Sequence, residues 1–171
     1  MIRRLVAGLA LASVAATAAL PVAATGPTLV DRAVSANERT GLFDTLLTAA
    51  TCSYFDGAVV EVLSAKGQKT LFAPTDDAFA ALSLTPDNVC AAFEATPDVL
   101  LDILLYHVTP GRRPAGWLSG KVGGSITMAN GETAAVSRMD GSLAVDGAKV
   151  IVRNVPASNG FIHAVDSVLL P

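Results

Sequence analysis

The spacing of apolar residues changes at Pro110-Gly111, about two thirds of the way along the chain. Before that point apolar side chains recur every three to four positions, which is typical of helices with one buried face. From Ser35 onward the first such set is Leu42, Phe43, Leu46, Leu47 and Ala50. The pattern predicts further helices near 58–65, 76–82, 86–95 and 97–107. It also predicts one buried strand, Thr70–Ala73, which contains β-branched and aromatic residues.

After Pro110-Gly111 the apolar positions alternate with polar ones, which is typical of strands. Asn130-Gly131, Asp140-Gly141 and Asp146-Gly147 are turn signals, and short apolar runs fit between them. Strands are predicted over 126–128, 133–136, 142–145, 150–155 and 161–169. Because helices fill the first half and strands most of the second, the chain is predicted to be one domain of the α+β class.

The N-terminus has the pattern of a secretory signal. Arg3-Arg4 precede an apolar run from Leu5 to Leu20, and small residues follow at Val22-Ala23-Ala24. A membrane-spanning helix needs about 20 apolar residues, so this run is short for one. We expect residues 1–24 to be a signal peptide cut after Ala24, with a polar lead-in over 25–35. An uncleaved membrane anchor is the alternative.

Composition and charge narrow the function classes. The chain has 171 residues, of which 51% are hydrophobic and 16% charged, with a mean hydropathy of +0.50. This composition excludes a disordered chain. Without Arg3 and Arg4, 10 basic residues stand against 15 acidic ones, a net charge of −5, which disfavours nucleic-acid binding. Residues 110–171 alone carry 6 basic and 4 acidic residues. This uneven distribution could orient a charged partner, although solvated faces that differ in charge are the favoured explanation.

The two cysteines, Cys52 and Cys90, bear on the compartment and on metal binding. An even number of cysteines in an exported chain favours a disulfide, because the compartment is oxidising. Two free thiols, either buried or exposed and reactive, are the alternative. Two thiolates alone do not make a zinc site, and we expect no cofactor.

No familiar catalytic motif is found in the sequence. It contains no GxSxG, HExxH, P-loop, EF-hand or GxGxxG pattern. The two histidines, His107 and His163, each lie in an apolar segment. Such histidines are more often buried and hydrogen-bonded than catalytic or metal-binding.

Two groups of residues have the composition of catalytic sites, but simpler interpretations are favoured. Asp76-Asp77 could be paired catalytic carboxylates, yet they follow Thr75 at a predicted helix start, where capping explains them. Ser158, His163 and Asp166 include the residue types of a catalytic triad. Because residues on a strand alternate between faces, His163 and Asp166 should point to opposite sides. We expect no catalytic residue.

Three segments together resemble the fasciclin-like (FAS1) domain, in the order found in that family: Thr70 to Phe79, Leu104 to Val108 and Asn159 to Pro171. The resemblance covers about 36–171. It implies a wedge-shaped β-sandwich with helices packed along one edge, and no known catalytic activity. It also implies structural roles for the motif residues Thr75, Asp76, His107, His163 and Asp166. In this fold the helices that carry Cys52 and Cys90 pack on the same edge, so the two side chains could meet.

The resemblance implies an exported, non-enzymatic module for cell adhesion or matrix interaction through protein or glycan binding. The expected partner is a cell-surface or matrix protein or polysaccharide, and weak self-association would supply the second site that bridging needs. We expect a periplasmic or secreted protein without a stable membrane anchor after signal cleavage. The alternative is a periplasmic carrier of a small molecule or glycan, which would use a cleft beside the helical edge.

The candidate binding residues lie in two neighbouring segments. Trp117 follows Arg112-Arg113-Pro114 in a predicted loop, and an indole beside guanidinium groups is the composition of an interface hot spot. The alternative is a tryptophan folded back over the core. Tyr106 and His107 are further candidates, because family adhesion motifs lie near this segment, although a structural role is expected for both.

Overall fold

The computed structural model describes residues 26–171. The predicted signal peptide, 1–24, lies outside the described residues. Within 26–171 no helix is both long and apolar enough to cross a membrane. Helices dominate the described chain up to residue 120, with the strands at 69–74 and 108–110 between them, and only strands follow, so the expected α+β class is confirmed.

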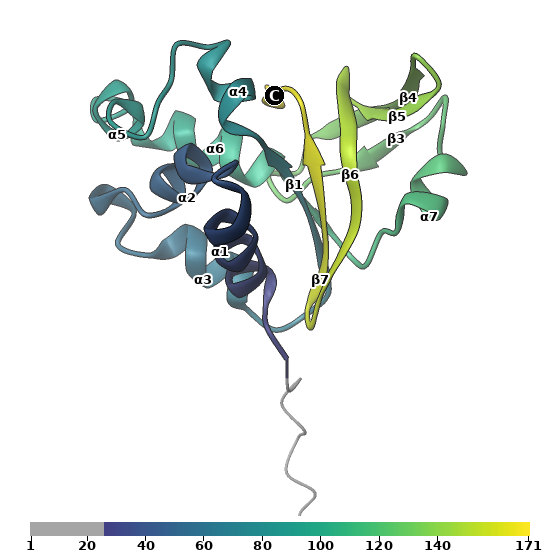
Figure 1. The fold of residues 1–171 in the computed structure, drawn as a ribbon, viewed down its shortest axis with the longest axis horizontal. Helices are drawn as coiled ribbons and strands as arrows, with labels where there is room; N and C mark the ends of the chain where they lie inside the picture. Colours follow the sequence, from purple (N-terminus) through teal and green to yellow (C-terminus); the bar gives the residue numbers. More distant parts are fainter. Residues whose placement is uncertain (1–25) are drawn as a thin grey trace, which may run out of the picture.

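Six helices gather on one side of the molecule, and the sheet lies on the other (Figure 1). They are α1 (Leu29–Thr40), α2 (Asp44–Ala50), α3 (Ala58–Ser64), α4 (Asp76–Ala80), α5 (Val89–Ala92) and α6 (Pro97–Tyr106). A short 3-10 helix, η1 (Ser53–Phe55), connects α2 to α3. A further helix, α7 (Ala115–Ser119), stands apart from these on the sheet side (Figure 1).

Seven strands form the sheet in the order β2-β1-β7-β6-β5-β4-β3. They are β1 (Lys69–Pro74), β2 (Val108–Pro110), β3 (Ser125–Thr127), β4 (Thr133–Met139), β5 (Ser142–Val145), β6 (Ala148–Ala157) and β7 (Gly160–Val165). β1 and β7 pair in parallel, and the other pairs are antiparallel. The two end strands approach each other, because the Ala129 amide donates to the Val108 carbonyl at 2.7 Å. The sheet therefore curls back on itself.

This curvature creates two cores. The alternation along β1 divides its side chains between them: Leu71 and Ala73 pack against the helices, whereas Phe72 points into the space enclosed by the strands. The second core includes Val136 and Val145. One sheet thus packs against helices on one side and against itself on the other.

The N-terminal elements differ from the sequence prediction. Residues 25–35 were expected as a polar lead-in, but α1 begins at Leu29. Thr28 and Asp31 form a capping box at this start, since the Thr28 amide donates to Asp31 Oδ2 at 2.8 Å and the Asp31 amide donates to Thr28 Oγ1. These hydrogen bonds lower the pKa of Asp31. Gly41, with φ +60°, ends α1 in the left-handed conformation.

The Asn159-Gly160 pair fastens the helices to the sheet. Asn159 Oδ1 accepts a hydrogen bond from the Leu29 amide, and its Nδ2 donates to the Leu63 carbonyl, both at 2.8 Å. Gly160 lies directly beside Lys69 of β1. A Cβ atom at this position would lie 1.7 Å from the Lys69 carbonyl oxygen, so only glycine fits.

The predicted disulfide is confirmed. Cys52, after α2, is joined to Cys90 of α5 with a Cα–Cα distance of 5.6 Å. The helix expected over 86–95 is shorter, because only Val89–Ala92 are α-helical. The disulfide therefore cross-links the short helix α5 to the end of α2 in the helical layer.

Candidate functional site

The residues from 111 to 115, here called the arginine loop, are held by side chains from the sheet. Thr70 of β1 is completely buried. Its hydroxyl donates to the Gly111 carbonyl at 2.9 Å and accepts from the Arg113 amide at 2.8 Å. One hydroxyl therefore fixes both ends of the turn that carries Arg112.

His163 of β7 and Asn154 of β6 hold the same loop from the other side. His163 Nε2 lies 2.9 Å from the Arg113 carbonyl, and its Nδ1 accepts from the Asn154 amide at 3.2 Å. These partners require the neutral ring with the proton on Nε2. Asn154 Oδ1 accepts from the Ala115 amide at 2.8 Å, at the start of α7. Burial lowers the pKa of His163, which keeps the ring neutral.

The arginine loop and α7 display cations stacked on aromatic rings. The Arg112 guanidinium lies 4.3 Å from the ring centre of Phe161, and the Arg113 guanidinium lies 4.0 Å from that of Trp117. Lys121 Nζ lies 5.3 Å from the same Trp117 ring. We call these five residues the cationic surface. Stacking holds each guanidinium flat; Arg113 Nε donates to the Pro110 carbonyl at 3.1 Å, and the terminal N–H groups of both arginines remain available to an oxyanion.

Trp117 combines features of both sequence hypotheses. Its ring is half-buried and packs against the second core. Arg113 covers it from outside. It lies on α7, not in a loop as predicted, because the sheet contacts to Arg113 and Ala115 fix the chain where the helix begins. Trp117 therefore supports the arginines rather than projecting alone.

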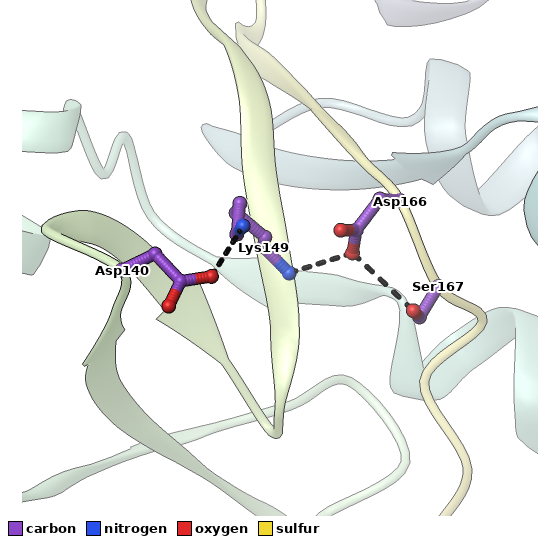
Figure 2. A network of polar contacts seen from close by, with 4 residues as sticks. All are labelled: Asp140, Lys149, Asp166 and Ser167. Carbon is purple, nitrogen blue, oxygen red and sulfur yellow. Dashed lines mark hydrogen bonds and ion pairs between the residues drawn. The ribbon is translucent and has the colours of Figure 1, made fainter.

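The cationic surface lacks internal counter-ions. Across residues 26–171 the single ion pair is Lys149 with Asp140, at 2.9 Å. Figure 2 shows this pair beside Asp166, whose Oδ1 accepts from the Lys149 amide at 2.8 Å and from the Ser167 hydroxyl at 3.2 Å. The described carboxylates thus leave the charges of Arg112, Arg113 and Lys121 open to an external anion.

Tyr106 and His107, the other predicted binding residues, are buried, at 3% and 1% exposure. The Tyr106 hydroxyl lies 3.2 Å from Asp146 Oδ2, and burial with this carboxylate raises the pKa of Tyr106 to about 12. His107 Nδ1 donates to the Ile103 carbonyl at 2.7 Å, and Nε2 accepts from the Leu169 amide at 2.9 Å. Neither side chain lies on a solvent-facing surface, so their burial speaks against the candidate contact role and agrees with the structural role expected for both.

Thr75 and Asp76 also have structural positions, but different ones from those expected. Thr75 precedes α4 and makes no side-chain capping bond. Asp76 instead caps α2, since its carboxylate accepts from the Thr45 amide at 2.7 Å and the Asp44 amide at 3.2 Å. This motif aspartate therefore joins two helices that are distant in sequence.

The residue types of a catalytic triad do not come together as one. His163 bonds the backbone of the arginine loop and of β6, whereas Asp166 bonds the Lys149 amide. Among the residues that the structure describes, no cluster of three or more His, Cys, Asp or Glu side chains could hold a metal ion. The arrangement is suited to binding through charge and stacking.

Sequence reasoning missed four residues of this site: Thr70, Lys121, Asn154 and Phe161. Thr70 and Phe161 lie in two of the three segments that resemble the family, but only the fold shows that they face the arginine loop. Asn154 has a left-handed φ of +60°, which asparagine tolerates better than most residues. The one signal in the sequence that could have drawn attention to Asn154 is its position inside a predicted strand, where asparagine is uncommon.

Comparisons with known proteins agree with this architecture. The model of the Fasciclin domain family matches residues 41–171. Protein sll1483 of Synechocystis sp. is 38% identical over 162 residues, which cover 91% of this chain and 81% of that protein. Immunogenic protein MPB70 of Mycobacterium bovis is 34% identical over 130 residues, or 74% of this chain and 63% of that protein.

A solved structure shows the same fold at low sequence identity. It is a FAS1 domain pair from the insect cell adhesion molecule Fasciclin I, with a TM-score of 0.64 and 18% identity. The match covers 85% of this chain and 51% of the solved chain. The chain therefore shares the FAS1 fold of that domain pair.

Proposed function

Because the chain belongs to the fasciclin domain family, we propose that it is an exported, non-enzymatic interaction module that binds an acidic polysaccharide of a cell surface or matrix. The cationic surface carries this proposal. Two stacked arginines without a carboxylate partner among the described residues form an oxyanion-binding face of fixed geometry. The disulfide supports export, since such bonds persist in oxidising compartments.

Preorganisation is the physical reason to place binding here. Three strands hold the arginine loop through Thr70, Asn154 and His163. Little backbone entropy is therefore lost when a ligand binds, and less of the contact energy is spent on ordering. Repeated anionic groups along a polysaccharide would offer many equivalent sites, and weak self-association of the module would supply the second binding site that avidity needs.

The test is retention of the purified protein on immobilised alginate, a polyuronate, with neutral dextran as reference. We expect retention that falls as salt rises. Changing both Arg112 and Arg113 to alanine should weaken binding about tenfold, roughly 1.4 kcal/mol. The matched control is Arg39→Ala, which removes an exposed cation from the last turn of α1. Equal retention on dextran, or equal loss in the control, would contradict the proposal.

An acidic protein as partner is a distinguishable outcome. It would leave alginate unbound while an acidic polypeptide such as polyglutamate is retained through the same two arginines. Self-association is checked by measuring the mass in solution at several concentrations, with and without alginate. A strict monomer that binds neither polymer would argue against an adhesion role.

A further inference from the structure

A cavity of about 270 Å³ lies inside the helical layer. Its walls come from α1, α2 and α3, and its floor comes from Leu71 of β1, Leu104 of α6 and Val108 of β2. These floor residues are buried. At the rim are exposed side chains, among them Val34, which is 39% exposed, and Thr51. The cavity is therefore deep and connected to the surface beside α1 and α2.

A void of this size is unusual for a domain this small. Protein interiors are packed as densely as organic crystals, with few voids larger than a water molecule. Each additional cubic ångström of empty apolar space lowers stability. An engineered apolar cavity of about 150 Å³ stays dry and binds benzene. By proportion, the present cavity has room for about ten non-hydrogen atoms.

The polar groups of the lining define the head of a suitable ligand. His107 reaches the cavity, but both of its ring nitrogens already have hydrogen-bond partners. The remaining polar lining residues are Asp44, Thr48 and Thr51, all from or directly after α2. The exposed Asp44 carboxylate repels an anionic head group, whereas the Thr51 hydroxyl, which donates to the Leu47 carbonyl at 2.8 Å, can still accept a hydrogen bond from a neutral hydroxyl head.

We infer that this cavity is a binding site for a neutral, mainly apolar molecule of about ten non-hydrogen atoms with a hydroxyl head at the α2 rim. The site shares no lining residue with the cationic surface, so it is independent of the proposed polysaccharide binding. It supplies the kind of cleft that the alternative prediction, a small-molecule carrier, requires.

The experiment is an NMR titration of the purified ¹⁵N-labelled protein with 1-octanol, which has nine non-hydrogen atoms. We expect saturable shifts confined to the elements that line the cavity, namely α1, α2, α3, β1, the end of α6 and the start of β2, with half-saturation at about 1 mM or below. Octanoate, the matched anion, should bind at least tenfold more weakly because of Asp44. Equal or tighter binding of octanoate would overturn the assignment of the head group.

A cavity-filling variant distinguishes a ligand site from ordinary core. Ala50 lines the cavity, so Ala50→Leu should abolish the octanol shifts without lowering Tm. The matched control is Ala58→Leu at the exposed start of α3, which does not line the cavity and should bind octanol normally. No saturable response in the wild type would overturn the inference, as would a clear drop in Tm for Ala50→Leu. If the wild-type protein binds octanol but is not retained on alginate, the proposed function alone is refuted.

Discussion

His107 makes the stability of the domain depend on pH in a calculable way. Burial lowers the pKa of this imidazole from 6.5 to about 4. In the folded state the ring is held neutral, because Nδ1 donates to the Ile103 carbonyl and Nε2 accepts from the Leu169 amide. A second proton, on Nε2, would point at the N–H of Leu169 and replace this hydrogen bond by a repulsion between two donors.

The sign and size of the effect follow from proton linkage. As pH falls below 6.5, the unfolded chain takes up a proton that the folded chain refuses, so folding becomes less favourable. The stabilisation is complete above about pH 6.5 and is lost progressively towards pH 4. Between pH 7 and pH 4.5 the loss amounts to about 2–3 kcal/mol. His163, whose pKa is also lowered, acts in the same direction.

The assay is urea unfolding at pH 7, 5.5 and 4.5, with the wild type compared against His107→Gln. Glutamine offers one donor and one acceptor and does not titrate, so this variant should show a smaller loss of stability between the same pH values. The difference between the two proteins isolates His107 from the carboxylates. If both proteins lose the same stability on acidification, the linkage argument is wrong.

Three further changes test the scaffold. Reduction of Cys52–Cys90, which are 38 positions apart, should cost up to about 4 kcal/mol in urea unfolding; two titratable thiols in the unfolded, unreduced protein would contradict the bond. Gly160→Ala should prevent folding, because its Cβ would meet the Lys69 carbonyl; a native circular dichroism spectrum and normal Tm would refute this. Asp76→Ala should cost about 1–2 kcal/mol through loss of the α2 cap, whereas an unchanged free energy of unfolding would show that the cap is dispensable.

The sequence predicted those elements whose ends carry local signals. Residues 97–107 were expected as a helix, and α6 begins at Pro97 after Thr96 and ends at Tyr106. The α3 helix was likewise predicted before Gly67. The capping box at Thr28 was present in the sequence but was missed, because the helix that follows it is rich in polar residues and buries only Leu29 and Ala33. The sequence around an element therefore predicts it only where the spacing of large apolar residues and the capping residues at its ends indicate the same helix.

The candidate site depended on contacts that no local pattern contains. Arg112, Arg113 and Trp117 were singled out together, and the structure does place them together. Their support was not predicted, because Thr70 and Asn154 reach the loop from strands far away in the sequence. The five-residue helix α7 was missed for the same reason, since its first amide is satisfied by Asn154.

The position of β7 between β1 and β6 has a consequence for when this chain can fold. Asn159, just before β7, accepts a hydrogen bond from the first residue of α1 and donates one to the end of α3. Helices α1 and α3 and strand β1 therefore depend on residues 159–165, which come much later in the chain. During synthesis the N-terminus leaves the ribosome first, so β1 and β6 cannot be joined through β7 until this last segment has been made. Such non-local strand pairing slows folding. For a chain threaded unfolded through a membrane pore, this delay preserves translocation competence. Under the proposed export, collapse would take place on the far side of the membrane, where Cys52 and Cys90 would meet an oxidant.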